Sequence, residues 1–194
     1  ICTLYADKTL KTDQAIQLIV NSKCQKPSVC NAAENLLIHR EVANQALPKI
    51  ARALKNAGVL LRGDAKSKSI LDAESIDCEI ATEKDWGTEY LDLILSIKVV
   101  ESIDEAIAFI NHYGSSHSDC ILTSDSDAAE TFLNGVDSST VYWNVSTRFT
   151  DGFEFGFGAE IGISTDKLHA RGPMGLKELC SYKYKVVGDG QIRT

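Results

Sequence analysis

The residue best suited to chemistry is Cys30, which lies two residues after the Pro-Ser turn formed by Pro27 and Ser28. Proline fixes its own φ angle and keeps the preceding residue out of the helical region, so the chain must turn just before the cysteine. A thiol at such a junction can be partly exposed and close to backbone N–H groups, as a nucleophile requires. The alternative is a small, buried and inert apolar residue, which is the commoner role of an isolated cysteine.

Strand and helix patterns alternate around this turn and along the rest of the chain. A helical pattern precedes Cys30, and an apolar, strand-like run follows it. Strands are predicted at residues 1–6, 35–39, 59–62, 78–81, 91–100, 119–123, 140–145, 161–164 and 182–187. Helices are predicted at residues 12–20, 41–57, 66–71, 102–114 and 124–135. The alternation predicts an α/β fold with three layers, in which helices flank a mainly parallel sheet.

Several helix ends carry recognisable signals. Thr12 is a candidate N-cap, and Ser102 with Glu105 has the spacing of a capping box. Gly58 is expected to end the second predicted helix. Pro48 lies inside that helix, which predicts either a kink or a later helix start, because proline lacks the N–H that an interior residue donates.

The composition is that of an ordinary globular chain of 194 residues, long enough for a substantial core. The net charge of −7 and the pI of about 5.1 argue against a general nucleic-acid binder, because no basic stripe is visible. The six cysteines and four histidines show no spacing typical of metal ligands, and no secretory signal is present. We therefore expect reduced thiols in the cytoplasm, no bound metal and, since no apolar run is long enough, no membrane insertion.

Four stretches of the chain carry distinctive motifs. They are NSK…PSVCNA…ENLLIH at residues 21–39, HSDCILT at 117–123, NVSTRFTDG at 144–152 and LHARGPMGL at 168–176. Together they resemble the γ-glutamyl phosphate reductase family of the aldehyde dehydrogenase superfamily. They occur in the order found in that family, and the resemblance runs essentially from end to end of the chain. It implies an aldehyde dehydrogenase-like catalytic domain, corresponding to the C-terminal half of the enzyme.

The reaction implied by the resemblance is the NADPH-dependent reduction of L-glutamyl 5-phosphate to L-glutamate 5-semialdehyde and phosphate, the second step of L-proline biosynthesis from glutamate. The Cys30 thiolate would attack the acyl phosphate, and hydride transfer to the resulting thioester would release the aldehyde. A cationic or N–H-rich setting should favour the thiolate, but we expect the nearby Lys23 and Lys26 to be solvated. Two alternatives stay open: a hydrolytic aldehyde dehydrogenase relative, and a non-catalytic assembly or interaction fragment of the same enzyme with an inert cysteine.

Further site residues follow from the same resemblance. The oxyanion would be held by the backbone N–H of Cys30 and by an asparagine outside this chain, while Asn31 either helps or only stabilises the turn. Glu89 corresponds loosely to a superfamily glutamate that reaches the nicotinamide ribose, the alternative being a surface glutamate. His169 and Arg171 belong to a family motif but are expected to be structural.

The segment at residues 146–152 is the second expected part of the site, because hydroxyls, a guanidinium and a carboxylate gather in a loop after a predicted strand. The implied substrate carries a phosphate, a carboxylate and an amine. Arg148 and the hydroxyls of Ser146 and Thr147 would bind the anionic groups, and Asp151 would bind the amine. The alternative is a polar turn held by an Arg148–Asp151 ion pair.

The chain begins with Ile1 and its only methionine is Met174, so we expect a piece of a longer protein. The resemblance divides it into a catalytic domain at 1–171 and a C-terminal segment at 172–194, whose strand at 181–188 would join a neighbouring subunit of a homo-oligomer. The cofactor-binding domain would precede this chain, so the 194 residues alone should bind NADPH weakly or not at all and should not turn over. The parent is expected to stand alone, with fusion to or association with glutamate 5-kinase as the alternative.

Overall fold

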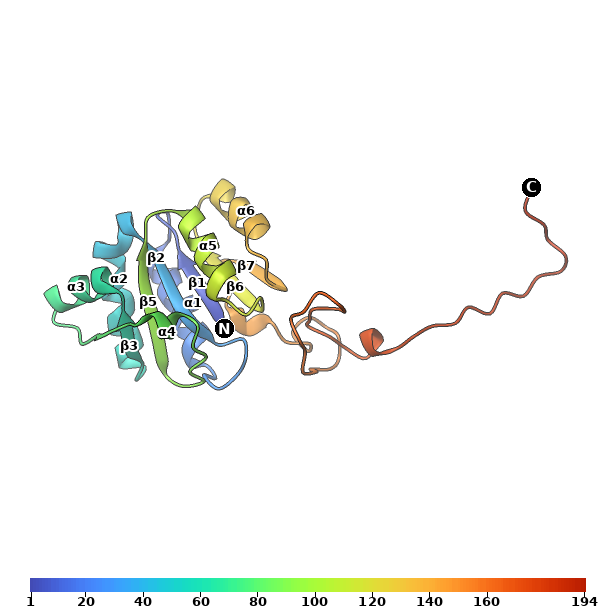
Figure 1. Cartoon of the computed structure of the whole chain (residues 1–194), viewed down its shortest axis with the longest axis horizontal. Helices are drawn as coiled ribbons and strands as arrows, with labels where there is room; N and C mark the ends of the chain where they lie inside the picture. The colour runs from blue at the N-terminus through green and yellow to red at the C-terminus, as the bar shows by residue number, and fades with distance from the viewer.

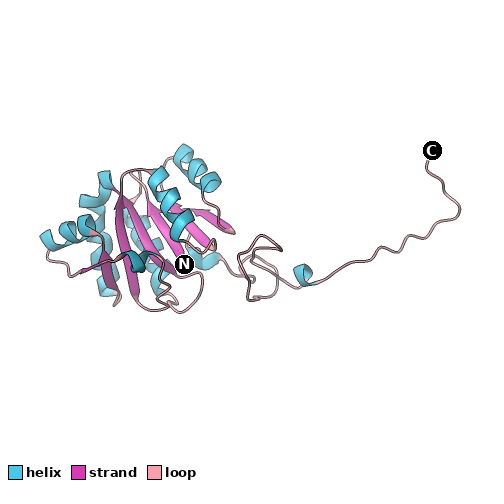
Figure 2. Ribbon diagram, viewed as in Figure 1, coloured by secondary structure: helices cyan, strands magenta, loops and turns pink.

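Every pair of neighbouring strands in the sheet runs parallel, in the order β4-β3-β5-β2-β1-β6-β7 (Figure 2). The computed structural model describes all residues from 1 to 194. The strands are β1 (Cys2–Ala6), β2 (Ala33–His39), β3 (Leu60–Gly63), β4 (Glu79–Ile80), β5 (Ile94–Val100), β6 (Ser118–Leu122) and β7 (Thr140–Trp143). The predicted α/β class is confirmed, and the sheet is parallel throughout rather than mainly parallel.

Helices cover both faces of this sheet and form the predicted three layers (Figure 1). Helices α1, α2 and α3 pack over one cluster of buried apolar side chains, and α4, α5 and α6 pack over another on the opposite face. Strand β2 supplies both clusters, since Leu36 and Ile38 belong to the first and Leu37 to the second. The helices are α1 (Thr12–Cys24), α2 (Arg40–Asn56), α3 (Ala65–Ala73), α4 (Glu83–Trp86), α5 (Ile103–Tyr113) and α6 (Ser126–Gly135). No helix combines the length and apolar character needed to cross a bilayer.

The helix ends confirm some of the predicted caps and correct others. Helix α1 begins at Thr12 itself and no side chain caps it, so Thr12 as the N-cap was wrong. The Ser102 side chain accepts from the Glu105 N–H at 3.2 Å, as a capping box requires, but the Glu105 carboxylate accepts from the N–H one residue before Ser102. A later start of α2 was also wrong: His39 caps it at Arg40, and the helix runs on through Pro48.

The C-terminal residues form no strand in this single chain, so the strands predicted at 161–164 and 182–187 were wrong for the isolated chain. Two short 3-10 turns follow the last strand, at Thr147–Phe149 and Lys177–Leu179, and beyond the second one the chain extends away from the folded body (Figure 1). The side chains of Val186 and Val187 are 92% and 94% exposed. A strand needs a neighbour for its backbone groups, and one chain offers none here. A strand that pairs with another subunit stays a prediction.

Cys30 lies at the amino edge of the sheet, in the loop that enters β2. In open parallel sheets, ligands usually bind at the carboxyl edge, where the strand order changes direction. Here that point lies between β1 and β6, and it is filled by the Asp7 carboxylate, which accepts hydrogen bonds from the hydroxyls of Tyr5, Thr9 and Thr123. The crevice between β1 and β6 is therefore satisfied by the chain's own groups, and the candidate nucleophile lies at the opposite edge of the sheet.

Candidate active site

The Cys30 side chain is exposed and lines a cavity of about 240 Å³ at the amino edge of the sheet. The predicted partly exposed thiol at a chain turn is thus confirmed. The Sγ atom of Cys2 lies 3.3 Å from the carbonyl oxygen of Cys30, which fixes the loop to β1. The other residues lining the cavity are His117, Thr150, Glu160, Ile161, Gly162, Ile163 and Pro173.

The electrostatic setting of Cys30 differs from the expected one. Partial burial raises the pKa of the thiol, and the carboxylates of Glu160 and Glu89 raise it further. The cysteine's own backbone N–H and the N-terminal ammonium lower it by less. Lys26 is exposed, as expected, but Lys23 is fully buried and paired with a carboxylate. Neither lysine is among the groups that shift the pKa of the thiol, and the setting within these 194 residues raises that pKa.

Asn31 joins the Cys30 loop to the polar segment at 146–152. The side-chain Nδ2 of Asn31 donates to the backbone carbonyl of Thr150 at 2.8 Å, and the backbone carbonyl of Asn31 accepts from the Thr147 hydroxyl at 2.7 Å. The Arg148 guanidinium donates to the side-chain oxygen of Asn31. The two stretches predicted to form the site are thus brought together. One N–H of the Asn31 side-chain amide is engaged with Thr150, so Asn31 stabilises the turn, and a contact between its second N–H and an oxyanion stays a prediction.

Ser146 and Thr147 are buried, with exposures of 2% and 0%. The Ser146 hydroxyl lies 3.1 Å from the hydroxyl of Ser22 on α1, and the Thr147 N–H donates to the same Ser22 oxygen at 3.3 Å. Both predicted substrate-binding hydroxyls are therefore occupied by protein groups here, and they anchor the 146–152 segment to α1.

Arg148 and Asp151 line one polar cavity of about 380 Å³, with Asn21, Gln25, Phe149 and Glu154. The Arg148 Nε donates to the Gln25 side-chain oxygen at 2.7 Å, and Asp151 accepts from the Phe153 N–H at 2.8 Å. No ion pair joins Arg148 to Asp151, so the alternative of a turn held by that pair is not what forms. The cavity presents one guanidinium and the carboxylates of Asp151 and Glu154, which suits a ligand with both charges.

Glu89 is exposed and lies just before β5, at the same edge of the sheet as Cys30. Its carboxylate is close enough to the thiol to raise the pKa of Cys30. Contact between Glu89 and a cofactor ribose stays a prediction. Arg171 donates to the carboxylate and to the carbonyl of Asp137, at 3.2 and 3.0 Å, which fits the expected structural role. His169 bonds only to the neighbouring carbonyl of Ala170.

His117 is a cavity residue to which no chemistry was assigned from the sequence. It is buried, and its Nδ1 lies 2.8 Å from the Ser118 hydroxyl. Burial, and secondarily the N-terminal ammonium, lowers the pKa of His117 to about 4. The only signal in the sequence was its place at the start of the 117–123 motif. His117 is neutral at physiological pH, so it adds no positive charge beside Cys30.

The shifted pKa of His117 predicts an acid-sensitive fold. The unfolded chain binds this proton near pH 6.5 and the folded chain only near pH 4, so stability falls as the pH drops through that window, by up to about 3 kcal/mol. Urea unfolding of a His117→Asn variant should show a smaller loss between about pH 7 and about pH 4.5. Burial raises the pKa of Asp119 to about 6, so protonation of this carboxyl stabilises the fold as the pH falls. This opposing effect is the same in the parent chain and in the His117→Asn variant. Equal losses in the two proteins would contradict the prediction.

Exposure predicts which of the six cysteines react with iodoacetamide in the native chain. Cys30 and Cys180 are exposed, whereas Cys2, Cys78 and Cys120 are buried and burial raises the pKa of each. Peptide mass spectrometry over time should find Cys30 and Cys180 labelled well before the three buried thiols, and labelling of Cys30 should keep accelerating above neutral pH. Early labelling of Cys2 would contradict the placement of β1.

Comparison with known proteins decides the family. No family model matches the chain. It is 57% identical to the γ-glutamyl phosphate reductases of Opitutus terrae, over 195 residues, and of Listeria monocytogenes, over 192 residues. These alignments cover 100% and 99% of this chain, and 46% and 45% of the relatives. The chain belongs to the γ-glutamyl phosphate reductase family. It spans less than half the length of these relatives.

Solved structures agree with this family assignment. The crystal structure of the γ-glutamyl phosphate reductase of Thermotoga maritima matches with a TM-score of 0.92 at 48% identity, over 100% of this chain and 46% of that one. A propionaldehyde dehydrogenase of Clostridium phytofermentans matches with a TM-score of 0.59 at 18% identity, over 90% of this chain and 46% of that one. The second match shows the fold alone. The expected aldehyde dehydrogenase-like architecture is confirmed together with the family.

Proposed function

We propose that this chain carries the nucleophile of an NADPH-dependent reductase that converts L-glutamyl 5-phosphate to L-glutamate 5-semialdehyde and phosphate, the second step of L-proline biosynthesis from glutamate. The main support is the position of Cys30, exposed on a cavity and joined through Asn31 to a segment that opens on a second, polar cavity. The names of the curated relatives support the same reaction.

In the proposed mechanism the Cys30 sulfur attacks the carbonyl carbon of the acyl phosphate. As the S–C bond forms, the oxygen becomes an oxyanion near the backbone N–H of Cys30, and the C–O bond to phosphate then breaks. The resulting thioester is reduced to a thiohemiacetal, whose C–S bond breaks to release the aldehyde and return the thiolate. Sulfur suits both halves because it is a strong nucleophile and a good leaving group. NADPH, when bound, supplies the hydride for the reduction.

Only one group of this chain suits a nicotinamide cofactor. Glu89 offers an exposed carboxylate at the edge of the sheet where Cys30 lies, which could accept hydrogen bonds from ribose hydroxyls. The glycine-rich residues 152–160 do not lie between a strand and a helix, as a dinucleotide-binding turn would. We therefore propose that the remaining contacts come from residues outside these 194, and that the chain alone binds NADPH weakly and does not turn over.

The polar cavity beside Arg148 is the proposed site for the amino-acid end of the substrate. The Arg148 guanidinium would bind a carboxylate in a fork geometry, and Asp151 would bind the ammonium group. Ser146 and Thr147, named with them from the sequence, would act by holding the segment against α1. We further propose a cytoplasmic enzyme that forms a homo-oligomer and has glutamate 5-kinase as its candidate protein partner.

Phosphate dependence separates this function from its rivals. A chimaera in which these 194 residues replace the matching part of the Thermotoga maritima reductase should reduce NADP⁺ in the presence of glutamate 5-semialdehyde and phosphate. A hydrolytic aldehyde dehydrogenase would reduce NADP⁺ equally well without phosphate, and a non-catalytic module would give no reduction. The isolated chain should give none either, and turnover by it would refute the proposed need for further residues.

Replacing Arg148 tests the substrate site. In the chimaera, Arg148→Ala should lower kcat/KM for glutamate 5-semialdehyde by about 10- to 100-fold, because a charged hydrogen bond contributes about 1.5–3 kcal/mol. Steady-state kinetics would measure the loss. The control is Arg52→Ala, which removes a guanidinium whose surface ion pair with Glu74 measures 2.6 Å. An equal effect of the two substitutions would remove Arg148 from the substrate site.

A further inference from the structure

The ion pair between Lys23 and Glu34 lies inside the protein, beside the Cys30 loop. The Lys23 Nζ is 2.7 Å from the Glu34 Oε2, and the two side chains are 0% and 1% exposed. Lys23 is near the end of α1 and Glu34 near the start of β2, so the pair joins the two ends of the loop that carries Cys30. The expectation that Lys23 is solvated was wrong, because the sequence could not show that a carboxylate meets it.

Glu34 also reaches the segment that carries Glu89. Its second oxygen, Oε1, accepts from the backbone N–H of Leu91 at 3.3 Å. Leu91 has a φ angle of +54°, which is a left-handed conformation. This conformation is unfavourable for any residue other than glycine, and it persists only when the surrounding structure holds it. One buried carboxylate therefore serves both the nucleophile loop and the strained residue two positions after Glu89.

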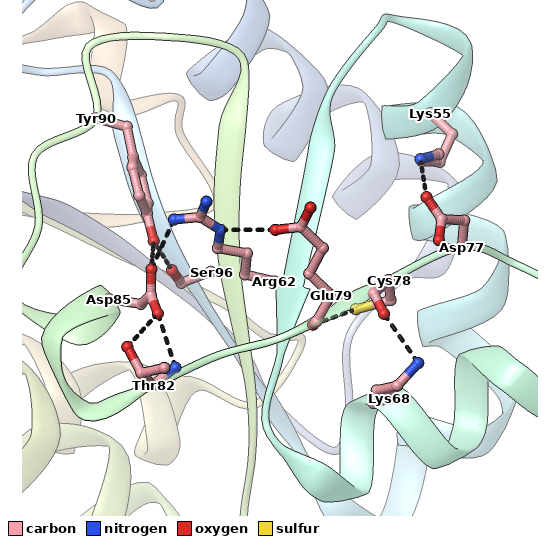
Figure 3. A network of polar contacts seen from close by, with 10 residues as sticks. All are labelled: Lys55, Arg62, Lys68, Asp77, Cys78, Glu79, Thr82, Asp85, Tyr90 and Ser96. Carbon is pink, nitrogen blue, oxygen red and sulfur yellow. Dashed lines mark hydrogen bonds and ion pairs between the residues drawn. The ribbon is translucent and has the colours of Figure 1, made fainter.

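The same segment is also held by a polar network around Tyr90 (Figure 3). The Tyr90 hydroxyl donates to the Asp85 carboxylate at 2.7 Å and lies 2.8 Å from the Ser96 hydroxyl. The Arg62 guanidinium donates to Asp85 at 2.8 Å and lies 5.4 Å from the centre of the Tyr90 ring. The two residues that follow Glu89 are thus both held, Tyr90 through its hydroxyl and Leu91 through its N–H, which restricts the backbone beside Glu89.

Stability alone does not account for a buried ion pair at this place. Removing two charges from water is unfavourable, and well-packed apolar side chains of the same size are often as stable or more so. What an apolar pair cannot provide is an acceptor for the Leu91 N–H. The function left for the pair is therefore geometric: it connects the Cys30 loop to the strained Leu91.

We propose that Lys23 and Glu34 are positioning residues that couple the Cys30 loop to the Glu89–Leu91 segment, so that the thiol and the Glu89 carboxylate keep a fixed spacing. This inference rests on the proposed function, in which Cys30 and Glu89 face the substrate and the cofactor. Neither positioning residue touches the reacting atoms. They act through the loop and through the Leu91 N–H.

Two double variants of the full 194-residue chain test the coupling. Lys23→Met/Glu34→Leu removes both charges and the acceptor for Leu91, whereas Lys23→Met/Glu34→Gln removes the charges but keeps an acceptor oxygen. Each contains no unpaired buried charge, so both are expected to fold. The first readout is hydrogen exchange of the Leu91 amide, followed by NMR. The second is the alkylation rate of Cys30 divided by that of Cys180, the exposed cysteine far along the chain.

The Leu variant should raise Leu91 amide exchange at least about tenfold and change the Cys30 to Cys180 rate ratio at least about threefold, while core amides of β5 stay protected. The Gln variant should keep both quantities within about twofold of the parent chain. An unchanged rate ratio in the Leu variant would overturn the proposal, as would equal changes in both variants. A failure of the proposed function would be seen in a different experiment: the reductase chimaera would form no thioester on Cys30. That result would not change the Leu91 exchange rate or the Cys30 to Cys180 rate ratio.

Discussion

Replacement of Cys30 by serine is expected to lower kcat of the reductase chimaera by at least about 1,000-fold. A hydroxyl is almost fully protonated at neutral pH, and an alkoxide is a poor leaving group in the second half of the reaction. The side chain otherwise keeps its size and its place in the cavity that it lines with His117 and Glu160. The measurement is phosphate-dependent NADP⁺ reduction by the parent chimaera and the Cys30→Ser variant, at matched concentration and after thermal unfolding has shown that both are folded.

The matched control for this variant is Cys180→Ser. Cys180 is the other exposed cysteine of the chain, and it lies in the extended C-terminal residues rather than at the cavity. Its replacement should leave kcat within about twofold of the parent, because surface substitutions away from a site have small effects. Activity retained by Cys30→Ser, or an equal loss in Cys180→Ser, would remove Cys30 as the nucleophile.

The second large effect concerns the fold. The single substitution Glu34→Ala should lower the free energy of unfolding by about 3–5 kcal/mol, because it leaves the fully buried ammonium of Lys23 without a counter-charge. Burial already lowers the pKa of Lys23 and raises that of Glu34, so each charge is maintained by its partner. Equilibrium urea unfolding of the chain would measure the loss.

The surface pair Arg40–Glu101 provides the control. Its nitrogen and oxygen atoms are also 2.7 Å apart, but the two side chains are 60% and 45% exposed. Glu101 also pairs with the exposed Lys66. Glu101→Ala should still lower the free energy of unfolding by only about 0–1 kcal/mol, since water solvates the guanidinium and the ammonium that remain. If Glu34→Ala lost no more stability than Glu101→Ala, the buried pair would have to be accessible to solvent, which would contradict its side-chain exposures of 0% and 1%.

The layers of the fold were predictable because they depend on local patterns. The apolar run at 91–100 became β5 (Ile94–Val100), and the run at 119–123 became β6 (Ser118–Leu122), within three residues at each end. Helix α5 begins directly after Ser102, whose hydroxyl accepts from the Glu105 N–H. Such signals lie within a few residues of the structure they determine, so a sequence contains them in full.

The contacts that build the site could not be predicted in the same way. Arg148 reaches Asn31 across 117 positions, and the Thr147 hydroxyl reaches the Asn31 carbonyl across 116. Lys23 was expected in solvent because its partner, Glu34, is reached only after the chain has turned around Cys30. These are tertiary contacts, and the residue types alone do not say which side chains meet.

The C-terminal residues failed as strands for a related reason. Lysines alternate with apolar residues between Tyr182 and Val187, which is a strand pattern, but a strand forms only against another one.

The raised pKa of Cys30 could not be predicted from the sequence either. Besides its own N–H, the charged groups that act on the thiol are the N-terminal ammonium and the carboxylates of Glu160 and Glu89, which the fold brings close to it.

The most direct test of the proposed mechanism is to trap the thioester. The chimaera is incubated with glutamate 5-semialdehyde and NADP⁺ without phosphate, so that oxidation can transfer the glutamyl group to the thiol but nothing can remove it as the acyl phosphate. The protein is then digested and analysed by mass spectrometry. The proposed mechanism predicts a glutamyl group on the peptide containing Cys30 and on no other cysteine peptide, with loss of the group when phosphate is added. A glutamyl group on another cysteine, or NADP⁺ reduction with Cys30 unmodified, would contradict it.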